Sequence, residues 1–281
     1  MKNLIIPILA GMVLSCANST AQENKFKENI HKEFAVSTNS SVSVYDLDGS
    51  IKVEGYDGDK VVIDIKKVIS AKNNQALEEG KRDTKLGFDQ GGDSLIVYTA
   101  APYDTRPNVR NQNVHIEYNI HLDYTIKVPK NVSLRLSTIN DGDILVENVN
   151  GVMKVNNING KITLNNIKAA NDVHTINGDV TINYTSLPPD NAKYYTLNGD
   201  LKITYPADFS ADCEFKSFQG EFFTDFENVE KLPSKIAKTT QEDKQGTTHK
   251  LNKASIIRIG NGDKKLKFET FNGNIYIKKQ V

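Results

Sequence analysis

Four glycines between positions 142 and 178 recur at spacings of nine, nine and eighteen residues, and apolar side chains follow each of them two and four positions later. Alternation of this kind places one face of a short strand in a core. Asn stands directly before three of these glycines, and Asn-Gly pairs tolerate the positive φ that corners require. The glycines are Gly142, Gly151, Gly160 and Gly178, and the apolar pairs are Ile144 and Val146, Met153 and Val155, Ile162 and Leu164, and Val180 and Ile182. The repeat predicts stacked short strands.

The same cassette occurs outside this segment. Nine residues after Gly160 the register meets Ala169 in place of glycine, which predicts an altered corner. The further copies are Leu47, Asp48, Gly49, Ile51 and Val53; Leu197, Asn198, Gly199, Leu201 and Ile203; and Phe271, Asn272, Gly273, Ile275 and Ile277. Internal repetition therefore extends from near residue 47 to the C-terminus, which favours one large all-β domain for this chain of 281 residues.

Two architectures fit such a repeat. In the first, each nine-residue piece holds one strand and one corner, and two or three pieces close one coil of a parallel stack. Asn148, Asn157 and Asn166 lie six residues after successive glycines and would form side-chain ladders if coils repeat every eighteen residues. The rival is an antiparallel sandwich with Asn-Gly hairpins. Hairpins do not require the constant spacing seen here, whereas a stack of equal coils does. We therefore expect a single-domain β-solenoid or β-roll with mainly parallel stacking.

The flanking segments predict further elements. Residues 22–33 are polar and are interpreted as a linker, and the β-repeat domain is expected over residues 34–281. The stretch from 70 to 86 has the only helix-forming composition and predicts one short helix that covers an edge or end of the sheet. Alternation from Val114 to Val128 predicts one long strand or two strands with a bend near Asn119. Residues 231–252 are polar, which predicts a mobile loop or a hairpin extension.

The first 21 residues have the pattern of an export signal, with Lys2 before an apolar run from Leu4 to Leu14. Two processing sites compete. Val13 to Cys16 resembles a bacterial lipobox, in which Cys16 is lipidated and becomes the mature N-terminus, whereas residues 19–21 suit an ordinary signal peptidase that cleaves before Gln22. We favour lipidation of Cys16, which would tether the domain to a membrane surface.

Composition excludes several classes of function. Basic and acidic residues both number 35, so no net field indicates a nucleic-acid partner. Cys213 is the one cysteine outside the leader, which excludes a disulfide framework and predicts a small core residue. The chain has no Trp, which weakens a platform for stacking on sugars. Tyr103, Arg106 and Arg110 in a loop, with Tyr118 and Tyr124 on a strand, are the best candidates for a sugar groove.

No residue pattern indicates a catalytic or metal site. His115 and His121 lie six residues apart, about 20 Å along a straight strand, and cannot share a metal. Acidic residues gather at expected corners, where their oxygens would suit calcium, but the spacing matches neither an EF-hand nor a glycine-rich calcium repeat. These residues are Asp46, Asp48, Asp57, Asp59, Asp141, Asp143, Asp179 and Asp200. Turn propensity explains them, so we assign no catalytic, cofactor-binding or metal-ligating residue.

The segment from Val128 to Leu136, followed by the Asn-Gly cassettes and flanked by the copies at 47–55 and 271–275, resembles the DUF4097 family of bacterial β-strand-repeat proteins. The resemblance covers most of the chain after the leader. It implies a right-handed β-solenoid-like or β-roll body, export from the cytoplasm and no established reaction. Members of this family are described as candidate adhesins.

The combined prediction is an exported, lipid-anchored and non-catalytic protein of the bacterial cell envelope, at the outer membrane or facing the periplasm, with exposure at the cell surface as an alternative. It would act in adhesion or envelope assembly, with an envelope protein or a glycan as partner and without a cofactor. Its binding energy would come from a broad polar sheet face and not from one deep pocket. The alternatives are a carbohydrate-active β-helix enzyme, either a lyase or a hydrolase, and a regulatory envelope module.

Overall fold

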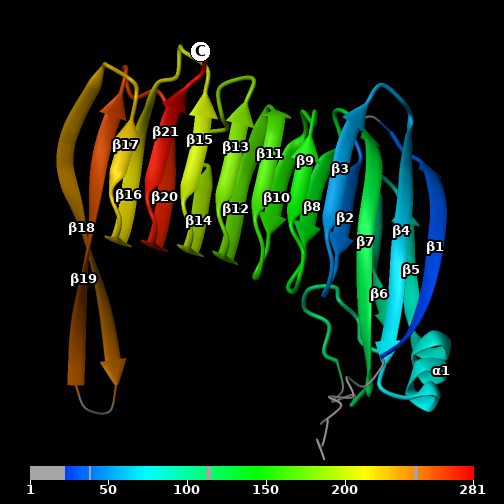
Figure 1. Ribbon diagram of the computed structural model, residues 1–281. Coiled ribbons are helices and arrows are strands. Elements are labelled where there is room, and N and C mark those ends of the chain that lie inside the picture. Colours follow the sequence, from blue (N-terminus) through cyan, green and yellow to red (C-terminus); the bar gives the residue numbers. More distant parts are fainter. Residues whose placement is uncertain (1–22, 38, 112–114, 244–245) are drawn as a thin grey trace, which may run out of the picture.

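The computed structural model describes residues 23–37, 39–111, 115–243 and 246–281, and the side chains of residues 235–253 are not described. The chain forms two large, mainly parallel sheets that face each other (Figure 1). In spatial order, the first sheet contains β1 (Asn24–Ala35), β4 (Lys60–Ala71), β7 (Tyr118–Pro129), β3 (Ile51–Tyr56), β9 (Ile144–Glu147), β11 (Ile162–Ile167), β13 (Val180–Tyr184), β15 (Leu201–Tyr205), β21 (Ile275–Lys279) and β17 (Phe222–Thr224).

The second sheet runs alongside the first. Its strands, in spatial order, are β18 (Val229–Asp243), β19 (Gly246–Ile259), β16 (Ala211–Gln219), β20 (Lys265–Asn272), β14 (Lys193–Asn198), β12 (Ala169–Asn177), β10 (Val152–Asn156), β8 (Ser133–Ser137), β2 (Ser41–Tyr45), β6 (Ser94–Ala101) and β5 (Lys85–Gly91). Inward-facing Val, Ile, Leu, Tyr and Phe side chains of both sheets form one continuous core.

Each rung of the stack consists of one strand from each sheet, joined by a corner. Of the two coil lengths left open by the sequence, the structure has eighteen residues, because Ile144, Ile162 and Val180 are Cα partners in adjacent parallel strands. Two nine-residue pieces therefore make one coil. The antiparallel sandwich is wrong for these strands, since β8 to β15 pair only in parallel.

The order of rungs in space differs from their order in the chain at both ends. The rung β2–β3 lies between β6–β7 and β8–β9, and the C-terminal rung β20–β21 lies between β14–β15 and β16–β17. Antiparallel strands follow at each end. In the first sheet β4 pairs with β7 and β1 pairs with β4, and in the second sheet β19 of the β18–β19 hairpin pairs with β16. At both ends of the stack, neighbouring rungs are therefore distant in sequence.

Several flanking predictions need correction. Residues 22–33 were expected as a linker, but from Asn24 on they belong to β1, because their backbone pairs with β4 along its whole length. The helix expected over 70–86 is shorter: α1 (Asn74–Asp83) begins after Asn73, whose side chain accepts a hydrogen bond from the Ala76 amide. The polar insertion forms the β18–β19 hairpin, as one of the two alternatives predicted.

The long alternating segment is one strand, β7, which starts at Tyr118 and continues past Asn119 to Pro129. Residue 114 lies outside the described part, and His115 precedes the strand. Cys213 is fully buried, which confirms it as a core residue, and burial raises the pKa of its thiol. The leader, with Cys16, lies outside the described residues.

Candidate binding surface

A ladder of glycines turns the chain at one edge of the stack. A Cβ atom built on Gly178 would lie 2.2 Å from the carbonyl oxygen of Gly160, and one on Gly199 would lie 2.2 Å from that of Gly178. Both glycines have φ of +156°, which side chains other than glycine rarely adopt. The successive corners therefore pack backbone against backbone. The ladder contains Gly49, Gly142, Gly160, Gly178, Gly199, Gly273 and Gly220.

A buried row of hydroxyls and one amide ties neighbouring corners together. Thr196 Oγ1 donates a hydrogen bond of 2.8 Å to the carbonyl of Gly178, and Thr175 Oγ1 donates one of 3.1 Å to that of Gly160. The same contact joins Thr138 to Gly49, Asn157 to Gly142, and Thr270 to Gly199. Asn157 was expected in a side-chain ladder with other asparagines, but it is 1% exposed and its amide donates to the backbone instead. Each of these bonds satisfies a carbonyl at a tight turn.

The residue just before the corner forms an exposed asparagine ladder. Asn159 Nδ2 donates to Asn140 Oδ1 at 3.3 Å, and the next three steps of the ladder are each 2.8 Å long. The ladder consists of Asn140, Asn159, Asn177, Asn198 and Asn272. At the opposite corners Asn166 donates to Asn148 at 3.2 Å, which confirms the predicted pairing at eighteen-residue spacing.

An apolar row lies beside this ladder, one residue earlier in each rung. It is half-buried in the middle of the stack and becomes exposed toward the C-terminal rungs, where Phe271 is 43% and Phe218 is 71% exposed. Their rings stack with centroids 4.7 Å apart. The row contains Ile139, Ile158, Ile176, Leu197, Phe271 and Phe218. We call the asparagine ladder and this apolar row together the corner face.

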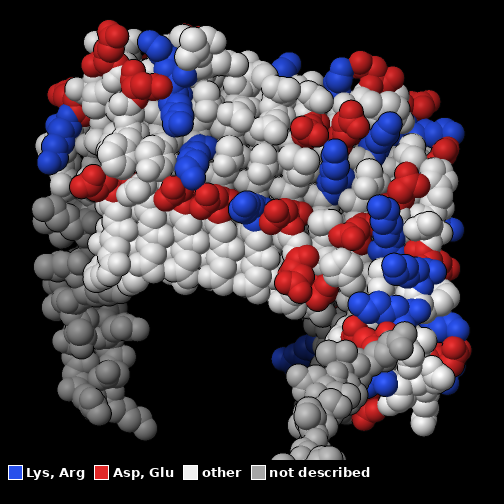
Figure 2. All heavy atoms as spheres, viewed as in Figure 1, with Lys and Arg blue, Asp and Glu red and all other residues white. Residues whose placement is uncertain are grey.

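Charged side chains border the corner face on one side. They follow the ladder glycines, and each carboxylate accepts a hydrogen bond from a backbone N–H of the next rung, as Asp179 does from Asp200 at 2.9 Å. Lys202 lies 3.0 Å from Asp179 and 3.1 Å from Asp200. Figure 2 shows these charges as a row across the central strands, with a broad uncharged band below it.

The corner face lies on a recessed edge of the molecule. In Figure 1 the β18–β19 hairpin at one end, and β4, β7 and α1 at the other, extend past the lower ends of the central strands. The Asn-Gly corners, at the lower ends of the central strands, therefore lie in a recess between these two projecting ends. A long, uncharged and regularly patterned surface is therefore framed by both ends of the stack.

A carboxylate and histidine cluster ends the corner face on the N-terminal side. His121 Nδ1 lies 2.5 Å from Asp48 Oδ1, and His121 Nε2 lies 3.4 Å from Asp123. The Ser50 hydroxyl donates to Asp123 at 2.5 Å. Burial lowers the pKa of His121, but the two facing carboxylates outweigh it and raise the pKa above its usual value. From the sequence we assigned no role to His121, and only the pairing of β7 beside β3 brings it to Asp48.

We expect His121→Gln to destabilise the protein more at about pH 5.5 than at about pH 8. The raised folded pKa means that the contribution of His121 is fully present below its unfolded pKa of about 6.5, and is lost as pH rises through the folded value. Urea midpoints of both proteins at both pH values measure the difference. Burial lowers the pKa of His174, so His174→Gln should show the opposite pH trend. An equal effect of His121→Gln at both pH values would contradict the assignment.

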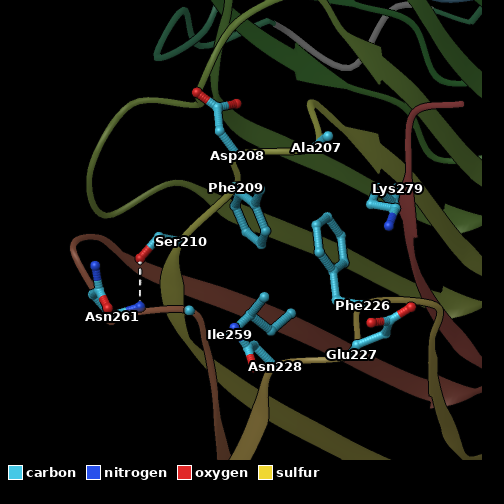
Figure 3. Close-up of a pocket in the computed structure, with 11 residues that line it drawn as sticks. Ala207, Asp208, Phe209, Ser210, Phe226, Glu227, Asn228, Ile259, Asn261 and Lys279 are labelled. Atoms are coloured by element: carbon cyan, nitrogen blue, oxygen red, sulfur yellow. Dashed lines mark hydrogen bonds between the residues drawn. The ribbon is translucent and has the colours of Figure 1, made fainter.

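Concave features also occur away from the corner face. One cavity has a volume of about 400 Å³ and lies beside the last strands of the stack. Its lining includes Phe209, Phe226 and Ile259, with Asp208, Glu227 and Lys279 around them (Figure 3). Ser210 Oγ accepts a hydrogen bond from the Asn261 amide at 2.9 Å there. A second groove of about 620 Å³ lies over the first sheet and is lined by Asn165, Asn183 and Thr204. Among the described residues, no group of three or more His, Cys, Asp and Glu is placed to hold a metal ion.

The residues considered for a sugar groove do not come together as one. Tyr118 and Tyr124 are 3% and 1% exposed, because both point into the core from β7. Arg106 is bound to Asp104 and Asp89 and lies over the ring of Tyr98 at 4.1 Å. In the described part of the chain, no helix has the length and hydropathy of a membrane span.

The fold and the corner ladders define a β-solenoid-like repeat protein. The family model Toastrack DUF4097 matches residues 123–278, which is more than half of the chain, and the chain belongs to this family. None of the curated proteins matches the sequence.

Three solved structures of low sequence identity are similar to this chain. A candidate cell adhesion protein from Clostridium sporogenes is 9% identical, with a TM-score of 0.38 over 90% of this chain and 100% of that chain. A candidate adhesin from Bacteroides fragilis is 12% identical, with a TM-score of 0.32 over 90% of this chain and 97% of that chain. A candidate lipid binding protein from Parabacteroides distasonis is 10% identical, with a TM-score of 0.30 and the same coverage.

Proposed function

We propose that this protein is an exported, lipid-anchored binding protein of the bacterial cell envelope, adhesin-like and non-catalytic, that contacts its partner through the corner face. The observation that carries the proposal is the exposed ladder from Asn140 to Asn272, which repeats one side chain over five neighbouring rungs. A repeated row of identical groups suits a long partner that makes the same weak contact several times.

The construction of the face supports a rigid contact surface. The glycine carbonyls beneath it are held by buried hydroxyls, and the amides are held by one another. A surface that is already ordered loses little conformational entropy when a partner binds. Shallow contacts can then add up over the length of the stack without a deep pocket.

The leader supplies the anchor in this proposal. Cys16 stands eight residues before Asn24, the first residue of β1, and eight residues span at most about 28 Å. A diacylglyceryl group on Cys16 would therefore hold the end of the molecule that contains β1 and α1 close to the membrane. The corner face would remain accessible along the side of the stack.

The test begins with the mature N-terminus. The full chain, expressed in a bacterial host and taken from the membrane fraction, is expected to start at Cys16 with a diacylglyceryl modification detectable by mass spectrometry. Cys16→Ser should release the protein from that fraction. A mature chain that starts at Gln22, or an unprocessed chain in the cytoplasm, would contradict the anchored form of the proposal.

The second part of the test is binding to isolated cell envelopes of the producing bacterium. In the unanchored Cys16→Ser chain, added back to the envelopes, Asn177→Asp places a charge in the corner face and should reduce the fraction of protein that co-sediments. Asn183→Asp is the matched control, because Asn183 also donates to an asparagine of the previous rung, Asn165, but lies outside the corner face. Equal binding of wild type and Asn177→Asp would contradict the role of this face.

A further inference from the structure

We infer that the corner face binds an uncharged polysaccharide chain, which lies along the stack and crosses successive rungs. This inference rests on the proposed function and names the class of ligand. It follows from the hydrogen-bonding capacity left in the asparagine ladder, from the apolar row beside it, and from the distribution of charge around both.

The ladder leaves hydrogen-bonding groups available at every rung. An Asn side chain has two N–H donors and a carbonyl with two lone pairs. Asn177 uses one N–H toward Asn159 and one lone pair for the N–H of Asn198. Each inner member of the ladder therefore retains one donor and one acceptor at an exposed position. Sugar hydroxyls both donate and accept hydrogen bonds, so they can use both groups.

The apolar row supplies the complementary contact. Sugar rings carry C–H faces that pack against aliphatic and aromatic side chains, while their hydroxyls point sideways. Ile158 and Ile176 lie beside the inner amides, and the stacked pair Phe218 and Phe271 provides a flat exposed platform at the C-terminal end. A strip with amides on one side and apolar groups on the other matches this division within a sugar chain.

Charge selects an uncharged chain. None of the ladder or apolar-row residues is charged, and the bordering row contains Asp143, Asp179 and Asp200 against Lys161 and Lys202. An anionic polymer would meet an excess of carboxylates along this border. A neutral chain has no such penalty.

The footprint predicts how affinity depends on chain length. Neighbouring rungs are about 4.8 Å apart, so the five steps from the rung of Asn140 to the rung of Phe218 cover about 24 Å. Affinity should therefore rise as an oligosaccharide lengthens and level off once the oligosaccharide spans this distance. A site that holds a single sugar would show no dependence on chain length.

The experiment titrates the full-length protein in detergent with neutral cello-, laminari-, malto- and manno-oligosaccharides of increasing length, by calorimetry. At least one series should bind with the expected length dependence, and Phe218→Ala should weaken that binding by roughly tenfold or more. Phe223→Ala is the matched control, because Phe223 lies on the same rung, is 43% exposed and stacks on Tyr276 at 5.0 Å, but on the other side of the corner.

Three outcomes would overturn the inference. The first is that oligogalacturonate or phosphatidylglycerol vesicles bind and no neutral oligosaccharide series does. The second is that Phe218→Ala and Phe223→Ala lose the same amount of oligosaccharide affinity. The third is that affinity does not depend on the length of the oligosaccharide. Envelope co-sedimentation separates this failure from that of the proposed function. If Asn177→Asp reduces envelope binding while the neutral oligosaccharides neither bind nor compete, the ligand class is wrong and the corner face remains the contact surface.

Discussion

Gly178→Ala is expected to destabilise the protein by about 3–5 kcal/mol. The added Cβ would lie 2.2 Å from the carbonyl oxygen of Gly160, and the residue has φ of +156°. Rotation of a side chain cannot relieve this contact, because the Gly160 carbonyl and the Gly178 backbone are both held by hydrogen-bonded neighbouring rungs. The shift needed would also break the hydrogen bond from Thr196 to the Gly178 carbonyl.

Urea unfolding followed by far-ultraviolet circular dichroism measures this effect. Gly91→Ala is the control, since a Cβ at Gly91 meets no atom within 4 Å. Its expected change is within about 0.5 kcal/mol. If both variants unfold at the wild-type midpoint, the backbone contact between neighbouring corners is not as close as the structure describes.

Removal of the last eighteen residues, by a stop after Asp263, is expected to abolish folding of the C-terminal half. The deleted strands β20 and β21 form an inner rung, between β14–β15 and β16–β17. Leu266, Phe268, Ile275 and Ile277 are each at most 1% exposed, and burial of four such side chains contributes roughly 6–12 kcal/mol. This is comparable to the whole stability of a typical domain.

The matched control shortens the hairpin at the spatial end of the stack. Ala237 and Asn252 are Cα partners, so an Asn-Gly turn can replace residues 238–251. This variant loses about two thirds as many residues but no strand of the core, and it should keep the wild-type circular dichroism spectrum and urea midpoint. Folding of the truncated chain with an unchanged midpoint would contradict the position of the C-terminal rung.

The local repeat could be predicted from the sequence because each rung carries its own signals. Apolar alternation specifies the buried face, and Asn-Gly specifies the corner, so the parallel stack followed from residues 142–182. The choice between two and three pieces per coil was settled only by the register of the strands. The order of the terminal rungs could not be predicted in this way. The cassette at Gly273 resembles that at Gly199, but nothing in either segment shows that these two corners are adjacent. The corner at Gly220 comes earlier in the chain than Gly273 and yet lies one rung beyond it.

The edges of the fold were also harder to predict than its centre. Residues 24–35 alternate weakly and are rich in charge, yet they form β1 because β4 offers twelve residues of paired backbone. The corner face was anticipated only as a broad polar surface. Its components depend on contacts between rungs, such as those of Asn140 with Asn159 and of Phe271 with Phe218. The contact of His121 with Asp48, 73 residues apart in the chain, likewise depends on the pairing of strands.

Disulfide cross-linking between corners tests the stacked ladder most directly. Asn198 and Asn272 are Cα partners on adjacent rungs, whereas Asn198 and Gln219 are two rungs apart, about 10 Å. In a Cys16→Ser background, the pair Asn198→Cys and Asn272→Cys should form a disulfide under mild oxidation, and the pair Asn198→Cys and Gln219→Cys should not. The reverse result would mean that the rungs follow the order of the chain, and that the corner face is not the continuous surface described.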